Sequence, residues 1–148
     1  MSDKLKIYLA GAMGGKTLEE MNTWRNSVYN ELYKWCKNQC KVIDPAYYYN
    51  TNMDASSWDY KDKEYIRWEL RNVKNCNLVI ARVEDGFCSL GTMSEITTAY
   101  NFGIPIILLV DNKITQELHP FIDEMCDKKF DDITNLAMYI SEYYARVI

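Results

Sequence analysis

The sequence has little of what several large classes of protein depend on. Its 148 residues include one histidine, three prolines and six glycines, and 17 basic side chains stand against 21 acidic ones. The net charge of −4 provides no general field to attract a nucleic-acid polymer. No apolar run reaches membrane-spanning length, and no signal-peptide-like segment follows Met1. We therefore expect a cytoplasmic protein that neither binds nucleic-acid polymers nor enters a membrane.

Paired cysteine motifs are also missing. The five cysteines are odd in number and scattered, and no two of them have CxxC spacing. This pattern indicates neither a disulfide framework nor a zinc site. We expect reduced, mostly buried thiols and no bound metal.

What the chain does have is apolar and aromatic residues. Hydrophobic residues make up 48% of the sequence, which suits one compact domain over 1–148. Twelve Tyr, four Trp and four Phe make up the aromatic 14%, more than a core of this size needs. Some of these rings are therefore expected to line a surface or a pocket.

Apolar runs alternate with longer helical patterns along the chain. Strands are predicted at 4–10, 41–43, 78–81, 104–110 and 129–130, and helices at 17–38, 61–74, 90–102, 116–125 and from 133 onward. Thr17 with Glu20 three residues later is a capping box that opens the first helix. The alternation indicates an α/β fold: a single-domain, doubly wound parallel sheet of about five strands, flavodoxin-like or Rossmann-like, with helices on both faces.

In such sheets the ligand lies beyond the carboxyl ends of the strands, and three turns are predicted there: 11–16, 45–59 and 84–89. The first turn, Gly-Ala-Met-Gly-Gly-Lys, lies between a strand and a helix, so its amides can point at an anion. Gly11, Met13 and Gly14 are therefore candidate substrate contacts. A flexible turn that needs glycine is the alternative interpretation. Lys16 and Arg25 either face a phosphate or are solvated helix charges.

The segment 89–100, Ser-Leu-Gly-Thr-Met-Ser-Glu-Ile-Thr-Thr-Ala-Tyr, follows the apolar strand at 78–81 and opens a helix. Glu95 lies more than one turn inside this helix, past the position where the dipole favours a carboxylate. One interpretation is a solvated residue on the helix surface. The other is a functional carboxylate, because Gly91 leaves room for a ligand to approach the helix start.

Four segments together resemble the nucleoside 2-deoxyribosyltransferase family, which includes the related nucleoside 5′-monophosphate N-glycosidases. They are Ile-Tyr-Leu-Ala-Gly-Ala-Met at 7–13, Asn-Leu-Val-Ile-Ala at 77–81, Ser-Leu-Gly-Thr-x-x-Glu at 89–95, and 99–105, which ends in Gly-Ile-Pro. The resemblance implies that Glu95 attacks the anomeric carbon of a (deoxy)nucleoside or its 5′-monophosphate and forms a covalent glycosyl-enzyme. A second nucleobase then takes the deoxyribosyl group, or water hydrolyses the intermediate. No cofactor is implied.

The resemblance also implies roles for three further residues. Glu69 stands where the family has an Asp that assists departure of the base. Ser89 stands where the transferases have an acid that binds the sugar 5′-hydroxyl and the monophosphate enzymes have a serine, whose hydroxyl can donate to a phosphate that an acid would repel. His119 stands where a neighbouring subunit contributes a side chain, which implies a homodimer or higher homo-oligomer. The alternative for His119 is a loop or cap residue.

Aromatic residues complete the predicted pocket. Tyr8, at the end of the first strand, is predicted to lie beside the sugar or the nucleophile. Tyr47, with Tyr48, Tyr49 and Trp58, is predicted to stack against a nucleobase. Packing in the core or at an interface would use the same rings.

Two function classes besides an enzyme stay open. A non-catalytic nucleotide-binding or sensing module would use the same sheet, with Glu95 paired off or pointing away from the pocket. A flavodoxin-like regulatory domain needs a phosphoacceptor Asp at a strand end, for which Asp44 is a lone candidate. The expected partners are small molecules: a nucleoside or nucleotide and a nucleobase.

Overall fold

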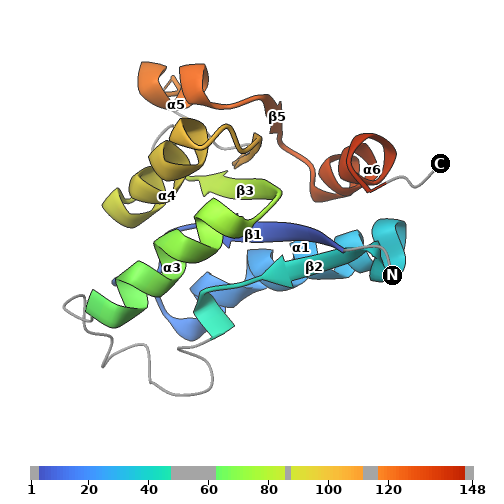
Figure 1. The fold of residues 1–148 in the computed structure, drawn as a ribbon, viewed down its shortest axis with the longest axis horizontal. Coiled ribbons are helices and arrows are strands. Elements are labelled where there is room, and N and C mark those ends of the chain that lie inside the picture. Colours follow the sequence, from blue (N-terminus) through green and yellow to red (C-terminus); the bar gives the residue numbers. More distant parts are fainter. Residues whose placement is uncertain (1–3, 48–62, 86–87, 112–116, 146–148) are drawn as a thin grey trace.

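The computed structural model describes residues 4–47, 63–85, 88–111 and 117–145 (Figure 1). Five parallel strands form one sheet in the order β2-β1-β3-β4-β5. They are β1 (Leu5–Ala10), β2 (Cys40–Ile43), β3 (Leu78–Val83), β4 (Ile106–Val110) and β5 (Lys128–Phe130). The predicted α/β class and the parallel sheet of five strands are confirmed.

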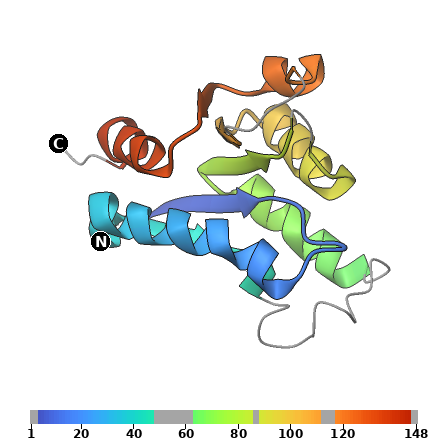
Figure 2. The same ribbon diagram turned by 180° about the vertical axis from the view of Figure 1, so that it is seen from behind.

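Helices cover both faces of this sheet (Figures 1 and 2). They are α1 (Leu18–Cys36), α3 (Lys63–Asn75), α4 (Leu90–Asn101), α5 (Pro120–Met125) and α6 (Ile133–Tyr143), with a short 3₁₀ turn at Lys37–Gln39 after α1. Apolar residues of α1 and α6 pack on one face, around Ile7 and Leu9 of β1. Residues of α3, α4 and α5 pack on the other face, around Tyr8 and Ala10. The alternation along β1 thus divides the core in two.

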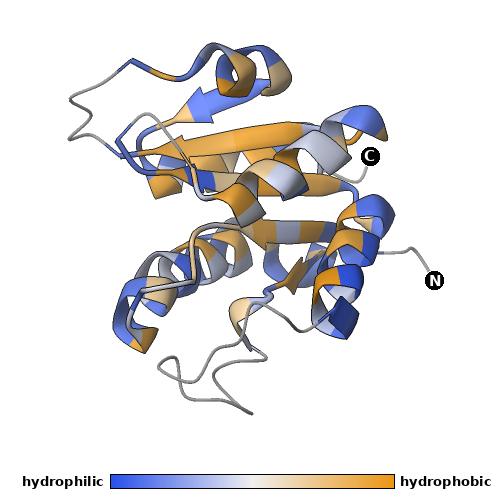
Figure 3. Cartoon of the chain, turned by 90° about the vertical axis from the view of Figure 1, so that its left-hand side faces the viewer, coloured by the Kyte–Doolittle hydropathy of each residue, from blue (hydrophilic) through white to orange (hydrophobic). Residues whose placement is uncertain are grey.

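The hydropathy pattern follows this layering. Strands β3 and β4 read as nearly continuous apolar runs, as strands covered on both faces do. In Figure 3 the apolar colour concentrates on the central strands, and the polar colour on the outer sides of the helices. No helix in the described part of the chain is long and apolar enough to cross a membrane.

Local capping explains where most helices begin. Thr17 and Glu20 form the predicted capping box, with the Thr17 hydroxyl accepting from the Glu20 amide and the Glu20 carboxylate accepting from the Thr17 amide. Ser89 caps α4 and Asp132 caps α6 through their side-chain oxygens. Helix starts are therefore readable from sequence wherever such a cap is present.

Four predicted boundaries are wrong by two residues or more: α1 ends at Cys36 and not at 38, β3 ends at Val83 and not at 81, and β4 and α5 begin late. The strand expected from 104 begins at Ile106, because the Ile104 amide donates to the Ala99 carbonyl at 2.9 Å and closes α4 after Gly103, whose φ is +68°. The helix expected from 116 begins at Pro120, and position 116 itself lies outside the described residues. Proline at the first helical position needs no partner for an amide hydrogen.

The cysteines carry no disulfide. Cys36 and Cys76 are buried, whereas Cys40, Cys88 and Cys126 are partly exposed. The free thiols agree with the prediction, but fewer of them are buried than expected.

Candidate active site

Glu95 is buried on the inner face of α4. Thr92, Glu95, Ile96 and Ala99 recur at helical spacing and all point toward the sheet. Only 5% of Glu95 is exposed to solvent. The interpretation of Glu95 as a solvated surface residue is therefore wrong, because the inward stripe of α4 includes this position.

Tyr8 is the hydrogen-bond partner of Glu95. It lies fully buried on β1, on the face that α3 and α4 cover, and its hydroxyl donates to Oε2 of Glu95. Burial, together with the negative charge of Glu95, raises the pKa of Tyr8 well above its usual value, so the phenol keeps its proton. Tyr8 was predicted to lie beside the sugar or the nucleophile, and the structure places its hydroxyl on Glu95; a role of Tyr8 toward a substrate stays a prediction.

Glu69 brings a second carboxyl to the same region. It lies on α3, and its Oε1 is buried with no hydrogen-bond partner among the described residues. Burial raises the pKa of Glu69 to about 7, while the positive charge of Arg25 lowers it. An unpaired, buried carboxyl oxygen is suited to hold a proton and to bond to a ligand. The role of Glu69 toward a leaving base stays a prediction.

The two carboxyls influence one another. Burial, and then the charge of Glu69, raise the pKa of Glu95 to about 8, while the Tyr8 hydrogen bond and the charge of Arg25 lower it. Interacting carboxyls titrate as a pair. Near neutral pH this pair can share one proton between two carboxyls. The pKa of Glu95 is the higher of the two, so in the free protein the shared proton lies mainly on Glu95.

One of the two interpretations of Arg25, a solvated helix charge, is wrong, and the other, a contact with a phosphate, stays a prediction. Arg25 is 1% exposed, so it is not a solvated helix charge, and its guanidinium bonds the chain itself. Nη1 donates to the Leu9 carbonyl and to Asp44, and Nη2 donates to the Gly11 carbonyl. Helical spacing could have revealed this, because position 25 lies on the same stripe as the buried residues Met21, Val28 and Leu32.

The glycine-rich turn is held by its neighbours. A Cβ on Gly11 would lie 2.4 Å from Cζ2 of Trp24, so glycine is required at this position for close packing. Lys16 forms an ion pair with Glu84 at 3.0 Å. Met13 and Gly14 are partly exposed. The turn thus lies at the carboxyl ends of the strands as predicted, and its contact with a substrate stays a prediction.

Ser89 and His119 both cap helices. The Ser89 hydroxyl oxygen accepts from the Thr92 amide at 3.2 Å and lies 3.0 Å from the Thr92 hydroxyl. His119 is exposed, and its Nδ1 accepts from the Phe121 amide at 3.2 Å. Nothing within 4 Å would meet a Cβ on Gly91, which leaves open space beside the start of α4. The cap interpretation of His119 therefore holds within a single chain.

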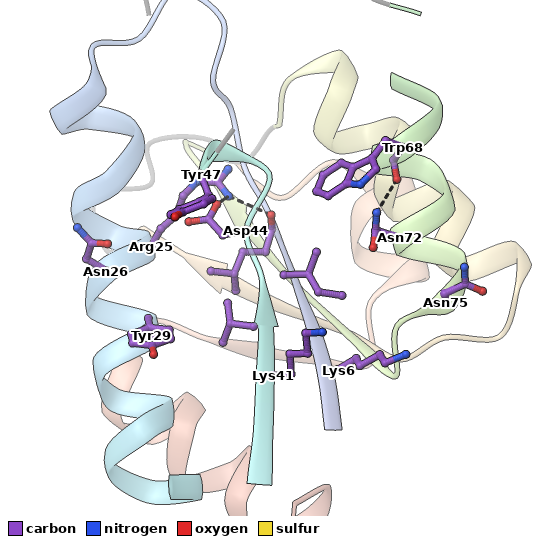
Figure 4. A pocket seen from close by; sticks show the side chains of 13 residues that line it. Lys6, Arg25, Asn26, Tyr29, Lys41, Asp44, Tyr47, Trp68, Asn72 and Asn75 are labelled. Atoms are coloured by element: carbon purple, nitrogen blue, oxygen red, sulfur yellow. Dashed lines mark hydrogen bonds and ion pairs between the residues drawn. The ribbon is translucent and has the colours of Figure 1, made fainter. Parts of the chain in front are cut away.

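A cavity of about 620 Å³ lies along the edge of the sheet at β2 (Figure 4). Arg25, Asp44, Tyr47 and Trp68 are among its lining residues, whereas Glu95 and Ser89 are not. Sequence reasoning missed Trp68, which is stacked on Tyr65 with a centroid separation of 5.4 Å.

Other parts of the predicted pocket are only partly described. Tyr47 is 67% exposed, as a residue that stacks on a ligand can be. The predicted stacking residues Tyr48, Tyr49 and Trp58 lie outside the described residues. Within the described ranges no three His, Cys, Asp or Glu side chains are grouped as a metal site.

Solved structures share this fold. No family model matches the chain, and no curated protein matches its sequence. A 2-deoxyribosyltransferase from Bacillus psychrosaccharolyticus matches with a TM-score of 0.64 over 89% of this chain and 90% of its own, at 18% identity. A conserved protein from Enterococcus faecalis V583 matches at 0.73 over 94% and 98%, also at 18% identity. A CMP N-glycosidase from Clostridium botulinum matches at 0.58 over 93% and 99%, at 16% identity. The chain therefore has the fold that these proteins share.

Proposed function

We propose that this protein is an enzyme that cleaves the N-glycosidic bond of a (deoxy)nucleoside or its 5′-monophosphate and transfers the deoxyribosyl group to another nucleobase. One observation carries the proposal: Glu95 is buried beside the sheet with Tyr8 on its Oε2, and a second carboxyl, Glu69, interacts with it. The folds of a 2-deoxyribosyltransferase and a CMP N-glycosidase support it.

The proposed reaction has two displacements. A carboxylate oxygen of Glu95 bonds to the anomeric carbon as the bond from that carbon to the base nitrogen breaks. This step requires the shared proton of the pair to lie on Glu69, which leaves Glu95 as the carboxylate. The departing electron pair stays on the base, which takes that proton from Glu69. An N–H nitrogen of a second base then attacks the same carbon, its proton passes to Glu69, and the bond to Glu95 breaks to release the carboxylate, so the configuration is retained. Tyr8 orients the attacking carboxylate through its hydrogen bond.

The direct test is an incubation with deoxynucleosides and with their 5′-monophosphates, each with and without an acceptor base, followed by chromatography. The proposal expects an exchanged nucleoside when the acceptor is present. Free base and sugar phosphate without exchange would instead identify a nucleoside 5′-monophosphate N-glycosidase. Binding of a nucleotide with no turnover of any of these substrates would favour a sensing module and would contradict the proposed cleavage.

Ser89 offers a matched test of substrate choice. Aspartate is as good a helix N-cap as serine, so Ser89→Asp keeps the cap on Thr92 while adding a negative charge. If Ser89 faces a 5′-phosphate, the variant should lose about tenfold or more in kcat/KM for the monophosphate, because like charges repel, and should keep its rate with the nucleoside. Steady-state kinetics with both substrates measures this. An equal change for both would contradict phosphate contact at Ser89.

We also propose that the chain forms a homo-oligomer in which His119 of one copy approaches the pocket of another. Leu90 beside Ser89 is 89% exposed, and Phe121 beside His119 is 66% exposed, so apolar side chains flank both proposed contacts. Light scattering should give a mass of at least two chains. A monomer at micromolar concentration would contradict this arrangement.

A further inference from the structure

Arg25 is the only buried cationic residue in the described part of the chain. Its guanidinium donates hydrogen bonds at the ends of two strands. Nη1 lies 3.0 Å from the Leu9 carbonyl and Nη2 lies 3.0 Å from the Gly11 carbonyl, both at the end of β1. Nη1 also lies 2.9 Å from Oδ1 of Asp44, which directly follows β2. One side chain of α1 thus bonds to the carboxyl ends of two neighbouring strands. Figure 4 shows the contact with Asp44.

The contacts with the end of β1 connect Arg25 to Glu95 through Tyr8. Leu9 and Gly11 flank the last residue of β1, and Tyr8 directly precedes Leu9. The Tyr8 hydroxyl donates to Glu95 across 87 positions of sequence. Fixing the end of β1 therefore fixes the phenol that orients this carboxylate.

The contact with Asp44 connects Arg25 to Glu69 through the turn after β2. Oδ1 of Asp44 accepts from the Ala46 amide at 2.9 Å as well as from Arg25, which orders the turn after β2. In that turn the Pro45 carbonyl accepts from the hydroxyl of Tyr65 on α3. Tyr65 and Glu69 are four residues apart and therefore lie on one face of the helix. The turn that Arg25 orders is therefore also bonded to the part of α3 that carries Glu69.

We propose that Arg25 is a positioning residue for the glycosidic reaction: it sets the distance and orientation between Glu95 and Glu69 by holding the ends of β1 and β2. Its positive charge also acts on both carboxyls. The inference rests on the proposed function for its kinetic consequences. Its structural part, the hold on two strand ends, rests on the contacts alone.

Arg25 provides two separate properties, a planar group with donors in fixed directions and a positive charge, and different substitutions remove one or both of them. Lysine keeps the charge but cannot present donors in three fixed directions, whereas methionine fills similar space with neither charge nor donor. The charged and titratable groups that act on Glu95 come from each surrounding element: Tyr8 on β1, Arg25 on α1 and Glu69 on α3. The thiol of Cys88 lies within the electrostatic reach of Glu95. Of these groups, only Arg25 is positive.

The experiment compares Arg25→Lys, Arg25→Met and the control Arg71→Met, an exposed arginine on α3. Arg25→Lys should lower kcat/KM about 100-fold, because small misplacements of reacting groups have effects of that size, and should leave the ascending limb of the pH–rate profile in place. Arg25→Met should lose at least as much and move that limb to higher pH, because removing the cation raises the pKa of both carboxyls. The control should match wild type. Loss of activity that follows only the unfolded fraction, with the pH limb unmoved in Arg25→Met, would overturn the proposal.

Two further measurements separate this inference from the proposed function. Carbon-13 NMR titration of the glutamate carboxyls needs no activity: the midpoints of Glu95 and Glu69 should rise in Arg25→Met and stay in Arg25→Lys. Unmoved midpoints in Arg25→Met overturn the inference even in an active enzyme, and shifted midpoints support its electrostatic part even if no nucleoside is cleaved. If the Arg25 variants fail to fold, Asp44→Asn removes one acceptor charge. This variant should lower kcat about tenfold with its folded fraction unchanged, and wild-type kcat would overturn the proposal.

Discussion

Glu95→Gln is expected to reduce N-glycosidic cleavage by about 10³-fold or more. Glutamine has the shape of glutamate, and its amide oxygen can still accept from the Tyr8 hydroxyl, but a neutral amide cannot form the ester bond to the anomeric carbon. The fold should therefore persist while the chemistry stops. Product formation from whichever substrate the wild type cleaves measures the effect.

The control is Glu124→Gln on α5, which makes the same chemical change at an exposed position. It should keep wild-type rates. Mass spectrometry of wild type quenched during turnover should locate a sugar mass on the peptide that contains Glu95, and the Gln variant should show none. A Glu95→Gln protein with an unchanged rate would rule out the covalent mechanism, whatever the products are.

The second large effect is on stability: the folded protein should become less stable as the pH rises from 5 to 8.5. Burial raises the pKa of Glu69 to about 7 and that of Glu95 to about 8. In this range the folded chain therefore keeps protons that the unfolded chain has released. The free energy of unfolding therefore falls as the pH rises. The stabilising contribution of the two protonated carboxyls is complete below a pH of about 4.5 and is lost as the pH passes their pKa values in the folded protein. The expected fall is on the order of a few kcal/mol.

Denaturant unfolding at pH 5 and pH 8.5 checks this prediction. Glu95→Gln and Glu69→Gln should each flatten the pH dependence and should be more stable than wild type at pH 8.5, because a neutral side chain avoids the burial of a charge. Among the other shifted groups, Cys76 and Cys88 have pKa values raised to about 11, and the pKa of Glu20 is lowered. Hydrogen bonding with Cys40 lowers the pKa of Cys36 toward this window, so Cys36→Ser is the control for its contribution. A wild type equally stable at both pH values would contradict the burial of the pair.

In both predictions the buried carboxyls Glu95 and Glu69 carry the chemistry and lower the stability of the folded protein. A buried carboxyl with an unpaired oxygen does not stabilise a fold, and substitution by a neutral isostere at such a position is expected to raise stability while removing function. Opposite directions for activity and stability in the same variant would distinguish a functional carboxyl from a structural one.

Sequence patterns predicted the helices and strands of the candidate site well and the contacts of the side chains within them less well. Ser89 and His119 were predicted as ligand contacts, and the structure shows each bonding the start of its own helix. Capping and ligand binding use the same polar atoms at the same place in a helix, so the residue type alone cannot separate them. Arg25 shows the reverse case, since its charge suggested either a phosphate contact or solvent although its helical position was that of a buried residue.

By itself, the sequence determined the order of strands and helices, the capping box at Thr17, and the location of the Glu95 segment after a buried strand. These features depend on hydrogen bonds and apolar spacing within a few residues, which local sequence controls. Only the tertiary structure decided that β1 lies between β2 and β3, that Tyr8 meets Glu95, and that Arg25 joins two strand ends. Those contacts join residues up to 87 positions apart, and their geometry depends on sheet register and helix packing, which no short stretch of sequence encodes.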